Sequence, residues 1–344
     1  MDPTDPTAGP GPINPLAAEP EGTRQLQGLG PLIAKAQSRR RRLVLAALAA
    51  IGLGLALIVV GIFLARLRGL QVLQDELAAF PLDSASGVRP GMAARTLEAP
   101  GATTAVLMVH GWCSGPTDFS DLPERLQARG FHVRVMRLPG HGTSPEDFGA
   151  QTAEDWRGAV RAEFDDLAAR FPRVDGVGFS MGGALLVELA AEREFGRVAV
   201  LAPFFGLPYP RPFGWTVGGL AAGLQRILPY VDSGPGVRTL RCREHEDEFL
   251  KYRALPLAAV VQADAIGRAV DRDELLARVT EPLLVIAAPD DPVAGAERSL
   301  DALARTNSVE PASFIAESSE HILCWDCDAE AVKNAVVEFL LVGE

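Results

Sequence analysis

The sequence is poor in the residues that hold metal ions. Its 344 residues include only four cysteines and five histidines. Cys324 and Cys327 form a single C-x-x-C without a second pair or a nearby His-x-x-x-His, so the ligands of a structural zinc site are missing. The G-x-G-x-x-G fingerprint of dinucleotide binding is also missing. We therefore expect no metal and no organic cofactor, and the two cysteines either form a short local disulfide or are ordinary small apolar residues.

Positive charge is scarce in the larger part of the chain. Residues 70–344 hold 25 basic and 40 acidic residues, a net charge of −15. A domain of that charge is repelled by phosphate backbones. The composition therefore argues against nucleic acid as a partner.

The N-terminal segment contains a long run without charge. Residues 1–42 are rich in Pro and Gly, which predicts a flexible tail, and they end in four arginines at 39–42. Residues 43–65 follow, 23 residues without one charge, which is long enough to cross a membrane as a helix. A cleavable signal peptide normally lies at the extreme N-terminus, and a buried core helix rarely needs this length. We therefore expect a single transmembrane helix.

The charges that flank this helix predict its orientation. Lys35 and the arginines at 39–42 place five positive charges on its N-terminal side, against Arg66 and Arg68 on the other side. Positive charge favours the cytoplasmic side of a membrane. We expect a single-pass protein with a cytoplasmic N-terminus, whose globular part lies outside the cytoplasm.

Strand and helix patterns alternate after this segment, which is typical of an α/β sheet. Residues 66–100 are expected to form a linker, helical at 70–79, and the first strands. Six later apolar runs predict strands, at 105–109, 132–138, 174–179, 198–201, 283–287 and 313–316. Helices are expected between them, one opening at the capping box Thr152–Asp155 and the last spanning 328–341. The expected fold is a mostly parallel, doubly wound sheet formed by residues 101–203 and 282–344.

The alternation stops between Pro203 and Pro282, over about 80 residues, which exceeds the length of an ordinary loop. We interpret residues 204–281 as an inserted helical cap, with an apolar helical run at 217–228. The segment begins with five aromatic residues: Phe204, Phe205, Tyr209, Phe213 and Trp215. These side chains either line an apolar substrate site or form the core of the cap itself.

Ser180 lies in a G-x-S-x-G frame between the strand at 174–179 and a helical stretch at 183–192. A serine on such a sharp strand-to-helix turn needs glycine two residues before and after it, because a Cβ there would collide with neighbouring backbone. Gly178 and Gly182 fill these positions. The pattern predicts that Ser180 is a nucleophile.

A serine nucleophile needs a histidine base and a carboxylate that orients the histidine. His321 lies just before the last helix and is the best candidate base. The strand at 283–287 is followed by two carboxylates, Asp290 and Asp291, and the residues alone do not separate them. The remaining histidines are less suited to this role: His110 and His141 precede glycines in loops, His132 begins a strand, and His245 lies in a charged run of the cap.

When a serine attacks a carbonyl group, the carbonyl oxygen gains negative charge. Two backbone N–H groups are needed to stabilise this oxyanion. One is expected from Met181, the residue after the nucleophile. The other is expected from the loop after the strand at 105–109, which nominates the N–H of Trp112.

Five motifs in this order resemble bacterial carboxylesterases and monoacylglycerol lipases of the α/β-hydrolase superfamily: Val109–Trp112, Pro139–Ser144, Gly178–Gly183, Asp290–Val293 and Glu320–His321. The resemblance covers about residue 100 to the C-terminus. In that family the acid falls nine residues after the proline that opens the late strand, which implies Asp291, although Ala288 replaces the usual glycine of the family's G-x-x-D frame.

We expect a membrane-anchored serine hydrolase that cleaves short-to-medium acyl esters or monoacylglycerol-like lipids. Its catalytic residues are expected to be Ser180, Asp291 and His321. Two alternatives remain open: a non-catalytic, membrane-tethered scaffold or binding protein of the same fold, and an acyltransferase that uses the same three residues.

Overall fold

The computed structural model describes residues 21–206, 216–234, 240–242, 244 and 252–342. The chain forms two compact units, residues 1–61 and 62–344. Helix α1 (Glu21–Ala79) begins well before the expected membrane segment, so the prediction of a flexible tail is wrong for residues 21–42. Leu, Gln, Lys, Arg and Ala are good helix formers and favour this extension, against the cost of Pro31 inside the helix.

By length and composition, α1 contains one segment that is able to cross a membrane. Apart from the half-buried Ile62, its large apolar side chains between Leu43 and Leu64 are exposed and contact little of the rest of the chain. The stretch 70–79 is helical as predicted, but it is more than a linker because Val72, Leu73 and Glu76 are buried in the second unit.

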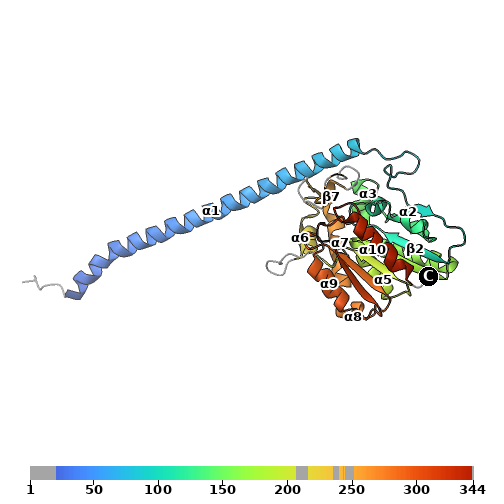
Figure 1. Ribbon diagram of the computed structural model, residues 1–344. Helices are drawn as coiled ribbons and strands as arrows, with labels where there is room; N and C mark the ends of the chain where they lie inside the picture. Colours follow the sequence, from blue (N-terminus) through green and yellow to red (C-terminus); the bar gives the residue numbers. More distant parts are fainter. Residues whose placement is uncertain (1–20, 207–215, 235–239, 243, 245–251, 343–344) are drawn as a thin grey trace, which may run out of the picture. The chain divides into compact units, whose positions relative to one another are not determined.

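The second unit is a sheet covered by helices (Figure 1). Its seven strands have the order β1-β3-β2-β4-β5-β8-β9. Only β1 is antiparallel to its neighbour. The strands are β1 (Arg95–Leu97), β2 (Thr104–Val109), β3 (His132–Val135), β4 (Arg173–Phe179), β5 (Val198–Leu201), β8 (Leu283–Ala287) and β9 (Pro311–Ile315). The six predicted strands are confirmed, although β3 ends three residues earlier and β9 begins two residues earlier than expected.

Each face of this sheet carries its own hydrophobic core, because successive strand side chains point to opposite faces. In β2, Ala105, Leu107 and Val109 belong to one core, and Val106 and Met108 belong to the other. The first core is completed by α4 (Ala153–Arg170), α5 (Met181–Ala190), α7 (Leu257–Val270), α8 (Asp273–Leu276) and α9 (Ala296–Ala304). The second is completed by α2 (Leu122–Gln127) and α10 (Ala329–Leu341).

The predicted capping box of α4 is confirmed. The Thr152 side chain accepts a hydrogen bond from the backbone N–H of Asp155, and the Asp155 carboxylate accepts one from the backbone N–H of Thr152. Two shorter helical segments follow β2 and β3, namely the 3-10 helix η1 (Pro116–Phe119) and α3 (Pro145–Ala150).

The segment between β5 and β8 is not wholly helical, which corrects the prediction for 204–281. After α6 (Val217–Leu224), the strands β6 (Tyr230–Asp232) and β7 (Ala254–Pro256) pair as an antiparallel ribbon. Helices α7 and α8 pack against α5 and so belong to the layer that covers the sheet. Phe205 lies in that core, whereas Tyr209, Phe213 and Trp215 lie outside the described residues.

The parallel strands place the loops that follow them at one edge of the sheet. Trp112 follows β2, Ser180 follows β4, Asp291 follows β8 and His321 follows β9. Residues that are far apart in the sequence therefore meet at this edge.

Candidate functional site

Ser180 lies on a strained turn between β4 and α5. Its φ of 51° is in the left-handed region, which is uncommon for a residue with a side chain. A Cβ on Gly178 would lie 2.6 Å from the Cα of Gly183, and a Cβ on Gly182 would lie 2.0 Å from the carbonyl oxygen of Val109. Only glycine fits at both positions, so the close approach of α5 to β2 and β4 explains the G-x-S-x-G frame.

The structure brings Ser180, His321 and Asp291 into one chain of hydrogen bonds. The His321 Nε2 atom is 3.0 Å from the Ser180 Oγ atom, and its Nδ1 atom is 2.8 Å from Asp291 Oδ2. All three residues are buried. With the carboxylate ionised, Nδ1 carries the proton and donates a hydrogen bond to Asp291, which leaves Nε2 free to accept a hydrogen bond from the Ser180 hydroxyl.

The Asp291 carboxylate is held by further contacts. Its Oδ1 atom accepts hydrogen bonds from the backbone N–H groups of Val293, at 2.7 Å, and Ala294, at 3.0 Å. Burial acts to raise its pKa, but His321 and these two amides outweigh burial, so the pKa lies below its ordinary value. The neighbouring Asp290 has a side chain that is 65% exposed, and it pairs with Arg241 rather than with the histidine.

The two expected oxyanion donors lie on segments that touch. Met181 is the first residue of α5, and Trp112 lies in the turn after β2. Gly182 lies so close to the end of β2 that a Cβ on it would be 2.0 Å from the carbonyl oxygen of Val109 and 2.4 Å from that of His110. The N-terminus of α5 therefore lies against the start of this turn.

Asp118 is a feature of the site that the sequence did not predict. It lies in η1 and is buried. Its Oδ2 atom accepts hydrogen bonds from the backbone N–H of Gly111, at 2.8 Å, and from the Ser114 hydroxyl, at 2.6 Å. The Oδ1 atom has no hydrogen-bond partner in the described part of the chain. The desolvation of this carboxyl raises its pKa to about 7, while the two hydrogen bonds and His321 act in the opposite direction. No pattern of residue types marks Asp118, because one of its two donors is backbone.

Two other histidines have structural surroundings. The His110 Nε2 atom accepts the backbone N–H of Leu138 at 3.0 Å, and its Nδ1 atom faces the carbonyl of Gly111 at 2.9 Å. Burial lowers the pKa of His110 to about 4, so the ring is neutral. Burial also holds the pKa of His141 well below its ordinary value. His132 begins β3 as expected, and His245 lies outside the described residues.

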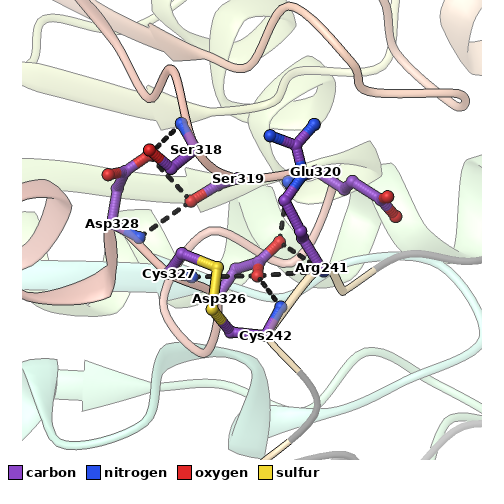
Figure 2. Close-up of a disulfide and its surroundings, with 8 residues drawn as sticks. All are labelled: Arg241, Cys242, Ser318, Ser319, Glu320, Asp326, Cys327 and Asp328. Atoms are coloured by element: carbon purple, nitrogen blue, oxygen red, sulfur yellow. Dashed lines mark hydrogen bonds between the residues drawn. A yellow bond between two sulfur atoms is a disulfide. The ribbon is translucent and has the colours of Figure 1, made fainter.

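A disulfide joins Cys242 to Cys327, with a Cα–Cα distance of 5.2 Å (Figure 2). The proposed local pair is therefore wrong: Cys324 is a buried thiol, and burial raises its pKa to about 12. The bond connects the segment after β6 to the loop between His321 and α10.

Asp326 reinforces this connection (Figure 2). Its carboxylate accepts the backbone N–H groups of Arg241 and Cys242 on one side and those of Glu320 and Cys327 on the other, all within 3.1 Å. Glu320 directly precedes His321. Asp326 therefore fastens the inserted segment to the loop that carries the histidine.

Within the described residues, one group of potential metal ligands comes together, formed by Cys242, Asp326 and Cys327. Its two sulfur atoms are joined in the disulfide, and the Asp326 oxygens already accept backbone hydrogen bonds. The donor set therefore does not fit a metal in this state, because a cysteine binds metal as a thiolate.

Comparison with known proteins agrees with the fold. The model of the family described as "Alpha/beta hydrolase family" matches residues 106–333. A thermostable monoacylglycerol lipase of Bacillus sp. (strain H-257) is 26% identical over 237 residues, which are 68% of this chain and 89% of the lipase. A carboxylesterase of Bacillus subtilis (strain 168) is 21% identical over 243 residues, which are 70% of this chain and 93% of the esterase.

A solved structure is also similar. The crystal structure of the monoacylglycerol lipase of Paleococcus ferrophilus superposes with a TM-score of 0.61 at 22% identity, over 72% of this chain and 97% of the lipase. At that identity the likeness concerns the fold. The predicted fold, a mostly parallel sheet of the α/β-hydrolase type, is confirmed.

Proposed function

The chain belongs to the Alpha/beta hydrolase family, as a carboxylic ester hydrolase of that type, and from this premise we propose that it is a membrane-anchored serine hydrolase acting through an acyl-enzyme. One observation carries the mechanistic part of the proposal. The Ser180 hydroxyl, the His321 ring and the Asp291 carboxylate form a continuous hydrogen-bonded chain at the edge where the parallel strands end.

In the proposed reaction, Ser180 Oγ attacks the ester carbonyl carbon while His321 Nε2 takes the hydroxyl proton. The tetrahedral oxyanion accepts hydrogen bonds from the amides of Met181 and Trp112. His321 then passes its proton to the leaving alkoxide, and the alcohol departs. A water molecule attacks the acyl-enzyme by the same route, His321 acting again as base, and releases the carboxylic acid.

Asp291 is the proposed carboxylate that orients His321. Its ionised carboxylate accepts the Nδ1 proton of His321, which fixes the tautomer and stabilises the imidazolium that forms after proton transfer. Asp290 is exposed and holds Arg241 of the inserted segment, which is a contact between two parts of the fold.

The proposed substrates are short-to-medium acyl esters or monoacylglycerol-like lipids. Two similar proteins are named as a monoacylglycerol lipase and a carboxylesterase, and both align over more than four fifths of their own length. An anchor in the bilayer would keep the enzyme beside lipid esters.

The proposed location is a single-pass protein with a cytoplasmic N-terminus and an extracytoplasmic catalytic part. The apolar stretch of α1 and the arginines before it support this orientation. The Cys242–Cys327 disulfide supports it independently, because such bonds persist mainly in oxidising compartments.

The central test uses the full-length protein in detergent micelles, treated with a fluorophosphonate probe and with p-nitrophenyl butyrate and a monoacylglycerol in parallel. We expect one adduct on Ser180, which should be absent in Ser180→Ala. Labelling and turnover should be much slower in His321→Ala and unchanged in the control Ser86→Ala, which alters an exposed turn. Absence of both adduct and turnover in folded wild type would favour the non-catalytic scaffold. Acyl transfer to added alcohols in preference to water would favour the acyltransferase.

A second test addresses the membrane. Alkaline phosphatase and green fluorescent protein are fused in turn to the C-terminus and expressed in a bacterial host. The proposal predicts an active phosphatase, a dark fluorescent protein and an intact N-terminus on the membrane-bound chain. A chain cleaved after the apolar segment would identify a signal sequence, and a chain released by alkaline carbonate would exclude the anchor.

A further inference from the structure

The last turns of α1 belong to the second unit, residues 62–344, although the family match begins only at residue 106. Val72 and Leu73 form a small buried cluster with Ala254 of β7. Gly69 lies so close to the ribbon that a Cβ there would be 2.1 Å from the carbonyl oxygen of Tyr230. This end of α1 therefore packs directly on the β6–β7 ribbon.

Glu76 makes the polar contacts of this packing. Its side chain is 1% exposed. One carboxylate oxygen accepts the backbone N–H groups of Arg253, at 3.0 Å, and Ala254, at 2.6 Å. The other oxygen pairs with the Arg89 guanidinium at 2.7 Å. Moving any of these partners away from the buried carboxylate would leave a buried donor or charge unpaired, which costs free energy. Glu76 therefore holds its partners in place.

The partners of Glu76 hold Tyr252 from two directions. Arg253 is the next residue in the chain, and the Arg89 guanidinium carbon lies 4.5 Å from the centre of the Tyr252 ring. The Tyr252 ring also stacks on Phe148, with centroids 4.9 Å apart. The Tyr252 hydroxyl accepts the backbone N–H of Thr143 at 2.9 Å.

Tyr252 in turn contacts the turn that carries Trp112. The backbone N–H of Tyr252 donates to the carbonyl of Cys113 at 2.9 Å. Phe148, on which Tyr252 stacks, also packs against the Trp112 ring, with centroids 5.8 Å apart. Cys113 has a φ of 57°, so this turn is held in a backbone conformation that needs support from its surroundings.

We propose that Glu76 is a positioning residue for ester hydrolysis, holding the Tyr252–Ala254 segment so that Tyr252 fixes the turn with the Trp112 amide. This inference rests on the proposed function, in which that amide stabilises the oxyanion. In this proposal the C-terminal end of α1, which continues from the apolar N-terminal segment, contributes to catalysis by positioning the oxyanion donor.

The test compares wild type, Glu76→Gln and the control Asp75→Asn, all as full-length protein in detergent. Asp75 is the exposed neighbour of Glu76 on α1, and its carboxylate bonds only Gln71 among the described residues. We expect Glu76→Gln to lower kcat for p-nitrophenyl butyrate by about tenfold with KM within about twofold of wild type, because oxyanion contacts act in the transition state. The rate of fluorophosphonate labelling should fall in parallel, and Asp75→Asn should match wild type.

Tyr252→Phe supplies a second route if Glu76→Gln does not fold. This variant keeps the ring and loses the hydroxyl contacts, and it should also lower kcat without raising KM. In the double variant the two losses should combine to less than their product, because both act through one segment.

Two outcomes would overturn the inference. One is a folded Glu76→Gln with a lower melting temperature but wild-type kcat, which would make Glu76 purely structural. The other is a wild-type kcat in Tyr252→Phe. An inactive wild type that takes no fluorophosphonate would instead refute the proposed function itself.

Discussion

The replacement Asp118→Asn gives a direct test of the electrostatics beside the site. Asp118 is buried, and desolvation raises its pKa to about 7 from the ordinary 3.8. Between these two values the folded protein keeps a proton that the unfolded chain has lost. The contribution of Asp118 to the free energy of unfolding must therefore fall as the pH rises through this range, because at this group the folded state binds more protons than the unfolded state.

The difference between the two pKa values corresponds to about 4 kcal/mol once the pH is well above 7. At pH 8 this cost is present almost in full, whereas at pH 5 only about a third of it has developed. Asparagine has the same shape and no charge. The free energy of unfolding of Asp118→Asn relative to wild type should thus increase by about 3 kcal/mol from pH 5 to pH 8.

Guanidinium chloride unfolding of the full-length protein in non-ionic detergent, followed by tryptophan fluorescence, measures this difference. Titrating groups that do not interact with Asp118 contribute equally to both proteins and cancel. Asp273→Asn, at a side chain that is 81% exposed, is the control and should show no such dependence on pH. A difference between Asp118→Asn and wild type that is equal at both pH values, or that shrinks as the pH rises, would refute the reasoning.

Three further predictions follow from the site. Asp291→Asn should lower kcat by about four orders of magnitude through the wrong histidine tautomer, while Asp290→Asn stays near wild type in the same assay; equal losses would contradict the assignment. Gly182→Ala should destabilise by about 3 kcal/mol or more, since backbone atoms block its Cβ, whereas Gly158→Ala in α4, where the Cβ meets nothing, should be neutral or stabilising in the same unfolding assay. Cys242→Ser with Cys327→Ser should lower the free energy of unfolding by about 4.6 kcal/mol for a separation of 85 residues, and dithiothreitol should lower that of wild type equally without affecting the double variant. A reductant that left wild-type stability unchanged would mean that the bond is absent in solution.

The features that were predictable from the sequence are those whose cause is local. The strand, turn and helix around Ser180 follow from neighbouring residues, and the glycines on either side are explained by contacts within that same unit and with β2. The capping box of α4 is similarly local, with its two partners three residues apart.

Asp118, Asp326 and Glu76 were not predictable, because backbone N–H groups supply half or more of the hydrogen bonds of each. Asp326 binds amides 84 and 85 residues away, and Glu76 binds amides 177 and 178 residues away. Every residue except proline has a backbone N–H, so the sequence gives no sign of which ones a buried carboxylate will meet. The disulfide differs from the expected local pair for a related reason. The short C-x-x-C spacing favours a local pair, whereas Asp326 brings Cys242 to Cys327 and leaves Cys324 in the core.

Proline at position 292 distinguishes Asp290 from Asp291. An aspartate that is to be fixed in a turn commonly accepts the N–H of the residue two positions later. For Asp290 that residue is Pro292, which has no N–H, whereas for Asp291 it is Val293, whose N–H is bonded to the carboxylate at 2.7 Å. Only Asp291 is able to hold one oxygen in the turn and present the other to His321, at 2.8 Å. The proline thus separates two adjacent carboxylates, leaving Asp290 exposed to pair with Arg241.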